Sequence, residues 1–288
     1  MKISGNTKLT GLLGSPVAHS ISPLMHNESF RVLGLDYVYL CFDVKENCLK
    51  TAVEGLKACG IRGFNVTMPN KNRIVSLMDH LSPAASLIGA VNTVINDGGV
   101  LTGCNTDGVG FMRSAHAAGY DIIGQEMTVL GNGGAATAVC AQAALDGVKR
   151  IHIFLRREST YYDRTEKLAK RLNEETSCEV LLYEQGDVES LQSCILQSAI
   201  LVNGTPVGMS PDVDHSLIED SSLLRPGLIV SDLIYEPKET KLLKLARSVG
   251  CHTFNGMYML LYQGAESFRL WTGHMMPVDR IRKMYFEV

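Results

Sequence analysis

The feature that most constrains this chain is a glycine-rich turn between an apolar run and an alanine-rich segment. Residues 127–138 read Met-Thr-Val-Leu-Gly-Asn-Gly-Gly-Ala-Ala-Thr-Ala, a pattern that predicts a strand, a tight turn and a helix. Such a helix presents unpaired backbone N–H groups and the positive end of its dipole, and glycines let an anion approach closely. The turn therefore predicts a pyrophosphate site. Its Gly131-x-Gly133-Gly134 pattern departs from the strict dinucleotide-binding spacing. A glycine-rich turn that binds no ligand is therefore an alternative interpretation.

Strands and helices alternate regularly after this turn. Strands are expected near 127–130, 151–155, 179–183, 199–203 and 228–232, with a short sixth strand near 251–254. Helices are expected near 135–146, 163–176, 188–197 and 240–249. Five or six strands joined by right-handed crossover helices and led by a glycine turn are typical of a doubly wound Rossmann domain. We place this dinucleotide-binding domain at residues 108–255.

The first 107 residues predict a second α/β unit with a mainly parallel sheet. Apolar strands are expected near 9–14, 37–44 and 63–66, and helices near 23–33 and 48–59, with a third helix that could begin near Pro69. Residues 91–95 and 100–101 flank an Asn-Asp-Gly-Gly turn as a hairpin. The tail, residues 257–285, has an amphipathic helical pattern and could pack back onto this unit. The two-domain α/β prediction therefore assigns residues 1–107 and 256–288 to the other domain.

Composition favours a small-molecule partner. A net charge of −3 gives no general attraction to nucleic acid or to an anionic membrane, and no apolar run has spanning length. The eight cysteines are scattered, without a C-x-x-C pair or a histidine at metal-ligand spacing. We therefore expect reduced thiols, a cytoplasmic protein and no metal.

Polar side chains follow the strands of the first domain. They are Ser20, Ser22, Thr67, Lys71, Asn92, Asn105 and Asp107. In a parallel sheet such loops share one edge, where open α/β folds bind ligands. Serine and lysine can hold a carboxylate, whereas amide, threonine and aspartate side chains can hold hydroxyl groups.

Lysine and aspartate can also form a proton-transfer pair. Alternatives remain for three of these residues. Ser22 and Asp107 could be helix caps, and Lys71 could be a solvated surface residue. Asn92 lies in an apolar stretch and needs partners if it is buried.

Six motifs together give the chain a family resemblance. They are Gly14-Ser-Pro-Val-Ala-His-Ser20-Ile-Ser22-Pro, Asn65-Val-Thr67-Met-Pro-Asn-Lys71, Gly89-Ala-Val-Asn92-Thr, Gly103-Cys-Asn-Thr-Asp107-Gly, Gly131-Asn-Gly-Gly-Ala135 and Tyr262-Gln263-Gly-Ala. In this order they resemble the shikimate dehydrogenase family, including its quinate/shikimate branch. The resemblance covers nearly the whole chain.

The resemblance implies a two-domain oxidoreductase that oxidises shikimate reversibly to 3-dehydroshikimate, and possible use of quinate, within chorismate and aromatic amino acid biosynthesis. Lys71 and Asp107 would be the catalytic pair. The implied substrate-binding residues are Ser20, Ser22, Thr67, Asn92, Tyr235 and Gln263. The implied cofactor-binding residues are Gly131, Asn132, Gly133, Gly134, Ala135, Arg156, Arg157, Glu158, Thr205 and Gly256.

The segment Leu155-Arg156-Arg157-Glu158 bears on the choice of cofactor. A carboxylate at the end of the second Rossmann strand favours the ribose hydroxyl of NAD, and an arginine favours the 2′-phosphate of NADP. Glu158 resembles the acidic residue of the quinate/shikimate branch, so we expect NAD, with NADP as a second cofactor. A solvated loop pair is the alternative for Arg157 and Glu158.

Two other functions stay open at this point. The chain could be a non-catalytic dinucleotide-binding regulator, which the joint presence of Lys71 and Asp107 disfavours. It could also be a tetrahydrofolate-type dehydrogenase, but the pair Ser20 and Ser22 fits a small hydroxy acid better. A monomer or a homodimer is expected.

Overall fold

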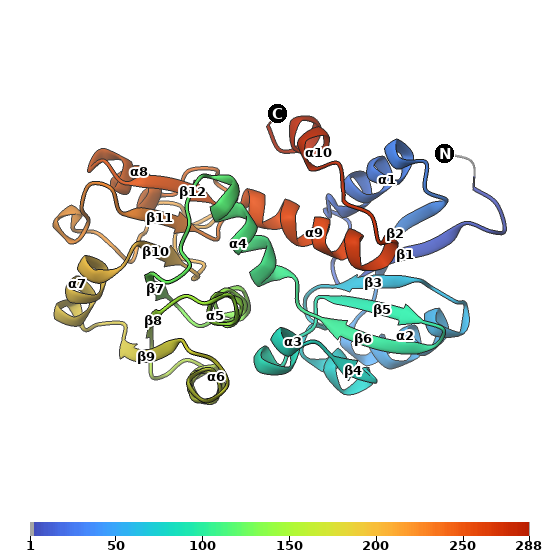
Figure 1. Ribbon diagram of the computed structural model, residues 1–288, viewed down its shortest axis with the longest axis horizontal. Coiled ribbons are helices and arrows are strands. Elements are labelled where there is room, and N and C mark those ends of the chain that lie inside the picture. Colours follow the sequence, from blue (N-terminus) through green and yellow to red (C-terminus); the bar gives the residue numbers. More distant parts are fainter. Residues whose placement is uncertain (1–2, 288) are drawn as a thin grey trace. The chain divides into compact units, whose positions relative to one another are not determined.

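The computed structural model describes residues 3–287 and divides the chain into two compact units. The first unit comprises the chain up to Thr106 together with the segment from Leu261 onward, and the second unit is Asp107–Leu260 (Figure 1). The sequence analysis places these junctions at 107/108 and 255/256. Each unit contains a six-stranded sheet covered by helices, so the predicted two-domain α/β class is confirmed.

The first unit has a mixed sheet in which most strands are parallel. Its strands are β1 (Lys8–Gly14), β2 (Tyr37–Asp43), β3 (Gly63–Val66), β4 (His80–Leu81), β5 (Thr93–Asp97) and β6 (Val100–Cys104), in the order β2-β1-β3-β5-β6-β4. Only β5 runs against its neighbours in this sheet. The short turn at Gly98 and Gly99 returns the chain directly from β5 to β6, which requires an antiparallel pair.

The helices of the first unit differ from the sequence-based prediction near Ser22 and near Pro69. They are α1 (Ser22–Leu33), α2 (Leu49–Ala58), α3 (Pro83–Ile88), most of α9 (Met257–Thr272) and α10 (Val278–Tyr285), with 3₁₀ turns at Glu46–Cys48 and Arg73–Leu77. Ser22 is not the cap of α1, because Ile21 occupies the N-cap position and Ser22 is already helical. No α-helix begins near Pro69. The buried Asn70 donates from Nδ2 to the carbonyl of Val44, which holds this segment as a loop.

A buried aromatic cluster forms much of the core beneath α1 and α9. The ring of His26 stacks on Tyr39 at 4.5 Å and lies 5.3 Å from Trp271 between ring centroids. Trp271 Nε1 donates to the carbonyl of Val94 at 2.9 Å, and Arg62 Nε donates to the carbonyl of Trp271 at 2.9 Å. These bonds tie α9 to strand β5 and to the loop before β3.

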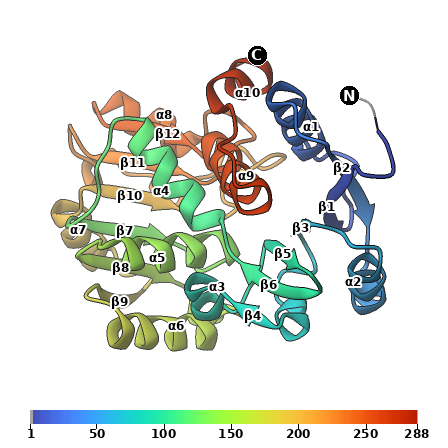
Figure 2. The same ribbon diagram turned by 45° about the vertical axis from the view of Figure 1, so that its right-hand side comes forward.

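The second unit has an all-parallel sheet. Its strands are β7 (Glu126–Leu130), β8 (Arg150–Leu155), β9 (Glu179–Glu184), β10 (Ile200–Asn203), β11 (Ile229–Asp232) and β12 (His252–Asn255), in the order β12-β11-β10-β7-β8-β9. Its helices are α4 (Asp107–Ala117), α5 (Gly134–Asp146), α6 (Tyr162–Glu175), α7 (Val188–Gln197) and α8 (Lys241–Ser248), with a 3₁₀ turn at Ser221–Leu223. In Figure 2, α4 and α5 lie in front of the strands of this sheet. On the other face of the sheet, a hydrophobic core packs residues of α7 and α8 against β10 and β11.

This strand order has a direct consequence for ligand binding. The chain winds from β7 outward to β9 and then returns to the other side of β7 with β10. The reversal between β7 and β10 is a topological switch point, and open α/β sheets bind ligands at the carboxyl ends of the strands beside it. The glycine turn that follows β7 lies at this position.

Candidate active site

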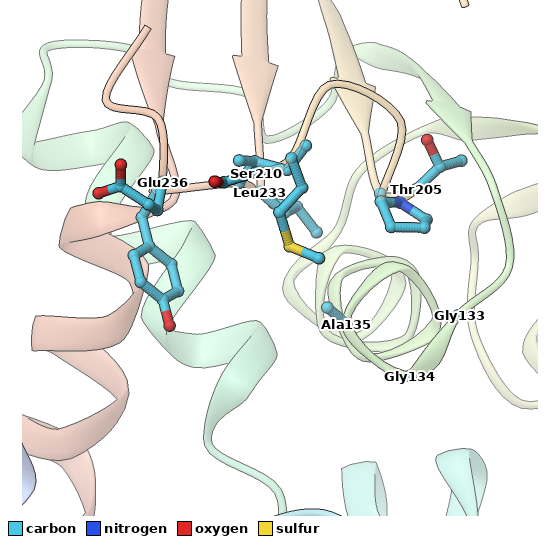
Figure 3. Close-up of a pocket in the computed structure, with 12 residues that line it drawn as sticks. Gly133, Gly134, Ala135, Thr205, Ser210, Leu233 and Glu236 are labelled. Atoms are coloured by element: carbon cyan, nitrogen blue, oxygen red, sulfur yellow. The ribbon is translucent and has the colours of Figure 1, made fainter. Parts of the chain in front are cut away.

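A cavity of about 410 Å³ lies at the switch point of the second unit. Its lining residues are Gly133, Gly134, Ala135, Gly204, Thr205, Pro206, Met209, Ser210, Leu233, Ile234, Tyr235 and Glu236. Figure 3 shows Gly133, Gly134 and Ala135 at the start of α5, with Thr205 on the loop after β10. The cavity therefore brings together five of the predicted site residues: Gly133, Gly134, Ala135, Thr205 and Tyr235.

The glycine turn is shaped to receive an anion. Gly131 has a φ of 94°, and a Cβ there would clash with the Thr205 methyl group. Gly133 is the N-cap of α5, and no side chain within the described residues caps that helix end. A Cβ at Gly134 would meet no atom within 4 Å. The helix thus presents its first N–H groups to open space, which fits the pyrophosphate of a dinucleotide.

Asn132 links the glycine turn to the loop after β8. Its Oδ1 accepts a hydrogen bond from Ser159 Oγ at 3.0 Å, and its Nδ2 donates to Thr165 Oγ1 at 3.1 Å. The predicted cofactor residues Arg156, Arg157 and Glu158 precede Ser159 and are all exposed, outside the cavity lining. The buried Asn132 therefore links the glycine turn to the loop after β8.

Thr205 is held by a hydrogen-bonded chain of polar residues that the sequence analysis missed. Its N–H and hydroxyl both donate to Asn203 Oδ1, at 3.1 and 2.7 Å. Asn203 Nδ2 donates to Asp232 Oδ1 at 3.1 Å, and Asp232 also accepts from Thr240 Oγ1 at 2.7 Å. Burial raises the pKa of Asp232. The polar ends of the apolar strands β10 and β11 were the available signal for this pair.

Tyr235 and Gly256, two further predicted residues of this unit, take different positions. Tyr235 is 48% exposed in the cavity wall. Gly256 is buried, and a Cβ there would clash with the carbonyl of Leu233. Gly256 thus permits close packing behind the cavity wall and is not among the lining residues.

In the first unit, the predicted serine pair lies at the start of α1: Ser20 belongs to the preceding loop, called here the serine loop, and Ser22 is the first helical residue. Ser22 N donates to Ser20 Oγ at 3.2 Å. Burial raises the pKa of Tyr39 well above its usual range, and a hydrogen bond with Ser22 opposes that rise. Burial likewise raises the pKa of Cys41, and a hydrogen bond with Ser20 opposes it. Two neutral groups of β2 therefore support two hydroxyls, an arrangement that can accept a carboxylate without a competing anion.

Asn92 lies in a buried polar network, as its apolar surroundings require. Its Oδ1 accepts from Thr106 N at 2.8 Å, and its Nδ2 donates to Thr106 Oγ1 at 3.0 Å. Asn65 Nδ2 donates to the hydroxyls of Thr93 and Ser267, both at 3.0 Å. Sequence reasoning missed these four partners, although Asn65, Thr93 and Thr106 belong to the quoted motifs. The network fixes the amide of Asn92 at the edge of the sheet.

The remaining predicted residues fall in both units. Thr67 follows β3, where its N–H donates to the carbonyl of Leu13 at 2.9 Å. Lys71 is half-buried in the same loop, and Gln263 lies on α9 within the first unit. Asp107 begins α4 and belongs to the second unit. The predicted substrate-binding residues other than Tyr235 therefore all belong to the first unit.

The described part of the chain contains neither a metal-ligand cluster nor a membrane-spanning helix. Within residues 3–287, no cluster of three or more His, Cys, Asp or Glu side chains is arranged to hold a metal ion. No helix in that range is long and apolar enough to cross a membrane.

Two family models match the chain. One, described as the shikimate dehydrogenase substrate binding domain, matches residues 12–94. The other, described as the shikimate 5′-dehydrogenase C-terminal domain, matches residues 256–283. The first match contains the serine loop, Lys71 and Asn92, and the second contains Gln263.

Full-length relatives and a solved structure extend this match. The chain is 52% identical to shikimate dehydrogenase (NADP(+)) of Listeria innocua over 99% of this chain and 98% of the relative. It is 43% identical to quinate/shikimate dehydrogenase of Escherichia coli, again over 99% and 98%. The structure of shikimate 5-dehydrogenase from Listeria monocytogenes with shikimate and NAD superposes with a TM-score of 0.96, at 51% identity and 99% coverage of both chains.

Proposed function

Because the chain belongs to the shikimate dehydrogenase family, we propose that it oxidises shikimate reversibly to 3-dehydroshikimate, with quinate as a second substrate. It is an NAD(P)-dependent oxidoreductase that acts on a CH–OH group. The observation that carries the proposal is the full-length similarity at 52% identity to a shikimate dehydrogenase. A non-catalytic regulator is not favoured.

The substrate residues proposed here follow from the chemistry of the first unit. Ser20 and Ser22 would hold the carboxylate, because their hydroxyls face neutral partners on β2. Thr67, Asn92 and Gln263 would hold the ring hydroxyls, with Tyr235 of the second unit as a further substrate contact. The buried network around Asn92 supports this role, because it fixes the amide before substrate arrives.

The proposed proton transfer belongs to Lys71 and Asp107. Lys71 would take the proton from the reacting hydroxyl, and Asp107 would orient that exchange. When bound, the nicotinamide supplies the acceptor for the hydride that leaves the same carbon. In the second unit, Gly131, Gly133, Gly134 and Ala135 would hold the pyrophosphate against the start of α5, and Thr205 would line the same cavity.

For the cofactor, we propose a preference for NAD with NADP also accepted. Glu158 follows the second strand of the Rossmann sheet, where a carboxylate suits a ribose hydroxyl. The relative from Listeria monocytogenes holds NAD, and the relative from Listeria innocua carries NADP(+) in its name. A cytoplasmic monomer or homodimer completes the proposal.

A matrix of shikimate and quinate against NAD and NADP tests the whole assignment. Initial rates are followed by absorbance of the reduced nicotinamide. We expect turnover of shikimate with both cofactors and a higher kcat/KM with NAD. If neither shikimate nor quinate were turned over, the enzyme assignment would be refuted. A kcat/KM one hundred times higher with NADP than with NAD would refute the cofactor preference.

A further inference from the structure

From the second unit we infer that Glu184 sets the discrimination between NAD and NADP by holding the guanidinium of Arg157. The inference rests on the proposed cofactor preference and names a residue outside the motifs discussed above. Glu184 is the last residue of β9, and Leu155 of β8 is its register partner. Arg157 Nε lies 3.3 Å from Glu184 Oε2. The arginine that could bind a 2′-phosphate is therefore already paired with a carboxylate.

The surroundings of the pair strengthen this contact. Glu184 Oε2 is buried and accepts no hydrogen bond within the described residues. The guanidinium therefore acts on an oxygen that water screens less than it screens the rest of the Glu184 side chain, which is 40% exposed. Arg157 itself has a largely exposed side chain, so its movement toward a ligand is not blocked by packing.

The backbone that carries Arg157 is fixed at both ends. Ser159 N donates to the carbonyl of Arg156 at 3.1 Å, which makes Arg157 and Glu158 the central residues of a β-turn. Ser159 Oγ donates to Asn132 Oδ1 at 3.0 Å, so the turn is tied to the glycine loop. The side chain of Arg157 is therefore the part of this loop that can move between Glu184 and a bound phosphate.

The consequence differs for the two cofactors. A ribose hydroxyl of NAD needs an acceptor such as Glu158 and makes no demand on Arg157. A 2′-phosphate of NADP carries about two negative charges and needs a cation, so it must draw Arg157 away from Glu184. Glu184 acts as a positioning residue that weakens the binding of NADP and leaves the binding of NAD nearly unaffected.

The test compares binding of two cofactor fragments by titration calorimetry. The probes are adenosine 2′,5′-bisphosphate and adenosine 5′-monophosphate, measured on the wild type and on Glu184→Gln. We expect the affinity ratio to shift toward the bisphosphate by about twofold to fivefold, the range for a partly exposed ion pair. Fragment binding needs no turnover, so its result is independent of whether the chain oxidises shikimate.

Two controls separate this mechanism from general electrostatics. Glu179→Gln removes the same charge at the other end of β9, where Glu179 pairs with Arg150. Glu184→Gln is repeated in an Arg157→Gln background. We expect no shift from Glu179→Gln and none from Glu184→Gln once Arg157 is gone. An unchanged ratio in Glu184→Gln, an equal shift in Glu179→Gln, or a full shift without Arg157 would each overturn the inference.

Discussion

Among single residues, Lys71 carries the proposed proton transfer. Its backbone carbonyl accepts from Val91 N at 2.8 Å, so a side-chain substitution leaves the loop anchored. We expect Lys71→Ala to lower kcat by about 10²-fold to 10⁴-fold and to change the KM for shikimate much less, as loss of a general acid–base group requires. Steady-state kinetics with both cofactors measures this.

A surface lysine of the same unit provides the control for that variant. Lys57 Nζ lies 3.8 Å from Asp79 Oδ2 at the surface. Lys57→Ala therefore removes a lysine that is not part of the proposed site. We expect its kcat to match the wild type. A near-normal kcat in Lys71→Ala would exclude Lys71 from the proton transfer.

His26 predicts a pH dependence of stability. Burial among aromatic rings lowers the pKa of His26 from 6.5 to about 3, and neither ring nitrogen has a hydrogen-bond partner within residues 3–287. Below pH 6.5 the unfolded chain binds a proton that the folded chain does not. The contribution of the neutral, buried His26 to the free energy of unfolding is therefore fully present above pH 6.5, and it is lost progressively as the pH falls toward 3.

The substitution His26→Phe isolates this effect. Phenylalanine keeps an aromatic ring beside Tyr39 and removes the titration. Between pH 7 and pH 5, we expect the wild type to lose about 2 kcal/mol more free energy of unfolding than the variant. Urea unfolding at both pH values measures the difference. Equal losses in the two proteins would show that His26 does not titrate in this way.

At the scale of elements, the turn between β7 and α5 depends on Gly131. Alanine there would adopt a positive φ and would also clash with Thr205, which borders the cavity. We expect Gly131→Ala to raise the KM for NAD at least tenfold, the effect of losing about 1.4 kcal/mol of binding free energy. The KM for shikimate should change much less.

Gly124→Ala separates backbone strain from the clash. Gly124 has a φ of 71°, and a Cβ there would meet no atom within 4 Å. We expect this variant to lose about 1 kcal/mol of stability and to keep its KM for NAD. If both variants raised the KM for NAD equally, general destabilisation and not the shape of the turn would be responsible.

The same elements show how far the sequence alone could go. Eleven of the twelve strands were predictable because their apolar runs are short and bounded by glycine, proline or polar residues, whereas the two-residue strand β4 (His80–Leu81) is too short to show such a run and was missed. The Rossmann order followed from the alternation after Gly131. The helix start near Pro23 was predicted, because proline fits the first turn of a helix, but the cap alternative for Ser22 was wrong, because the N-cap is Ile21.

Contacts across strands were beyond sequence reasoning. Arg157 and Glu184 are paired because β8 and β9 are neighbours in a particular register, and no local pattern encodes that register. Asn92 was predicted to need partners, but Asn65 and Ser267 reach its network through strand pairing and through α9. Tertiary placement decides such partners.

For the whole molecule, two units with separate cores predict that each ligand stabilises its own unit. NAD should slow amide hydrogen exchange in the second unit, foremost at residues 133–135 and 204–205, which line the cavity. Shikimate should slow exchange in the first unit, foremost around Ser22, Thr67 and Asn92. A ligand at one hundred times its Kd adds about 2.7 kcal/mol, which corresponds to roughly hundredfold slower exchange for amides that open with that unit.

Two variants make this exchange experiment decisive. Lys71→Ala should slow turnover by about 10²-fold to 10⁴-fold, so protection by both ligands together can be measured at short exchange times before the substrate is consumed. At the same NAD concentration, Gly131→Ala should show weaker protection by NAD and unchanged protection by shikimate, because only the second unit contains the turn. If NAD alone protected β1 and β3 as strongly as β7 and β10, the assignment of the cofactor to the second unit would be wrong. Protection confined to one unit by each ligand would locate the two binding functions independently of any rate measurement.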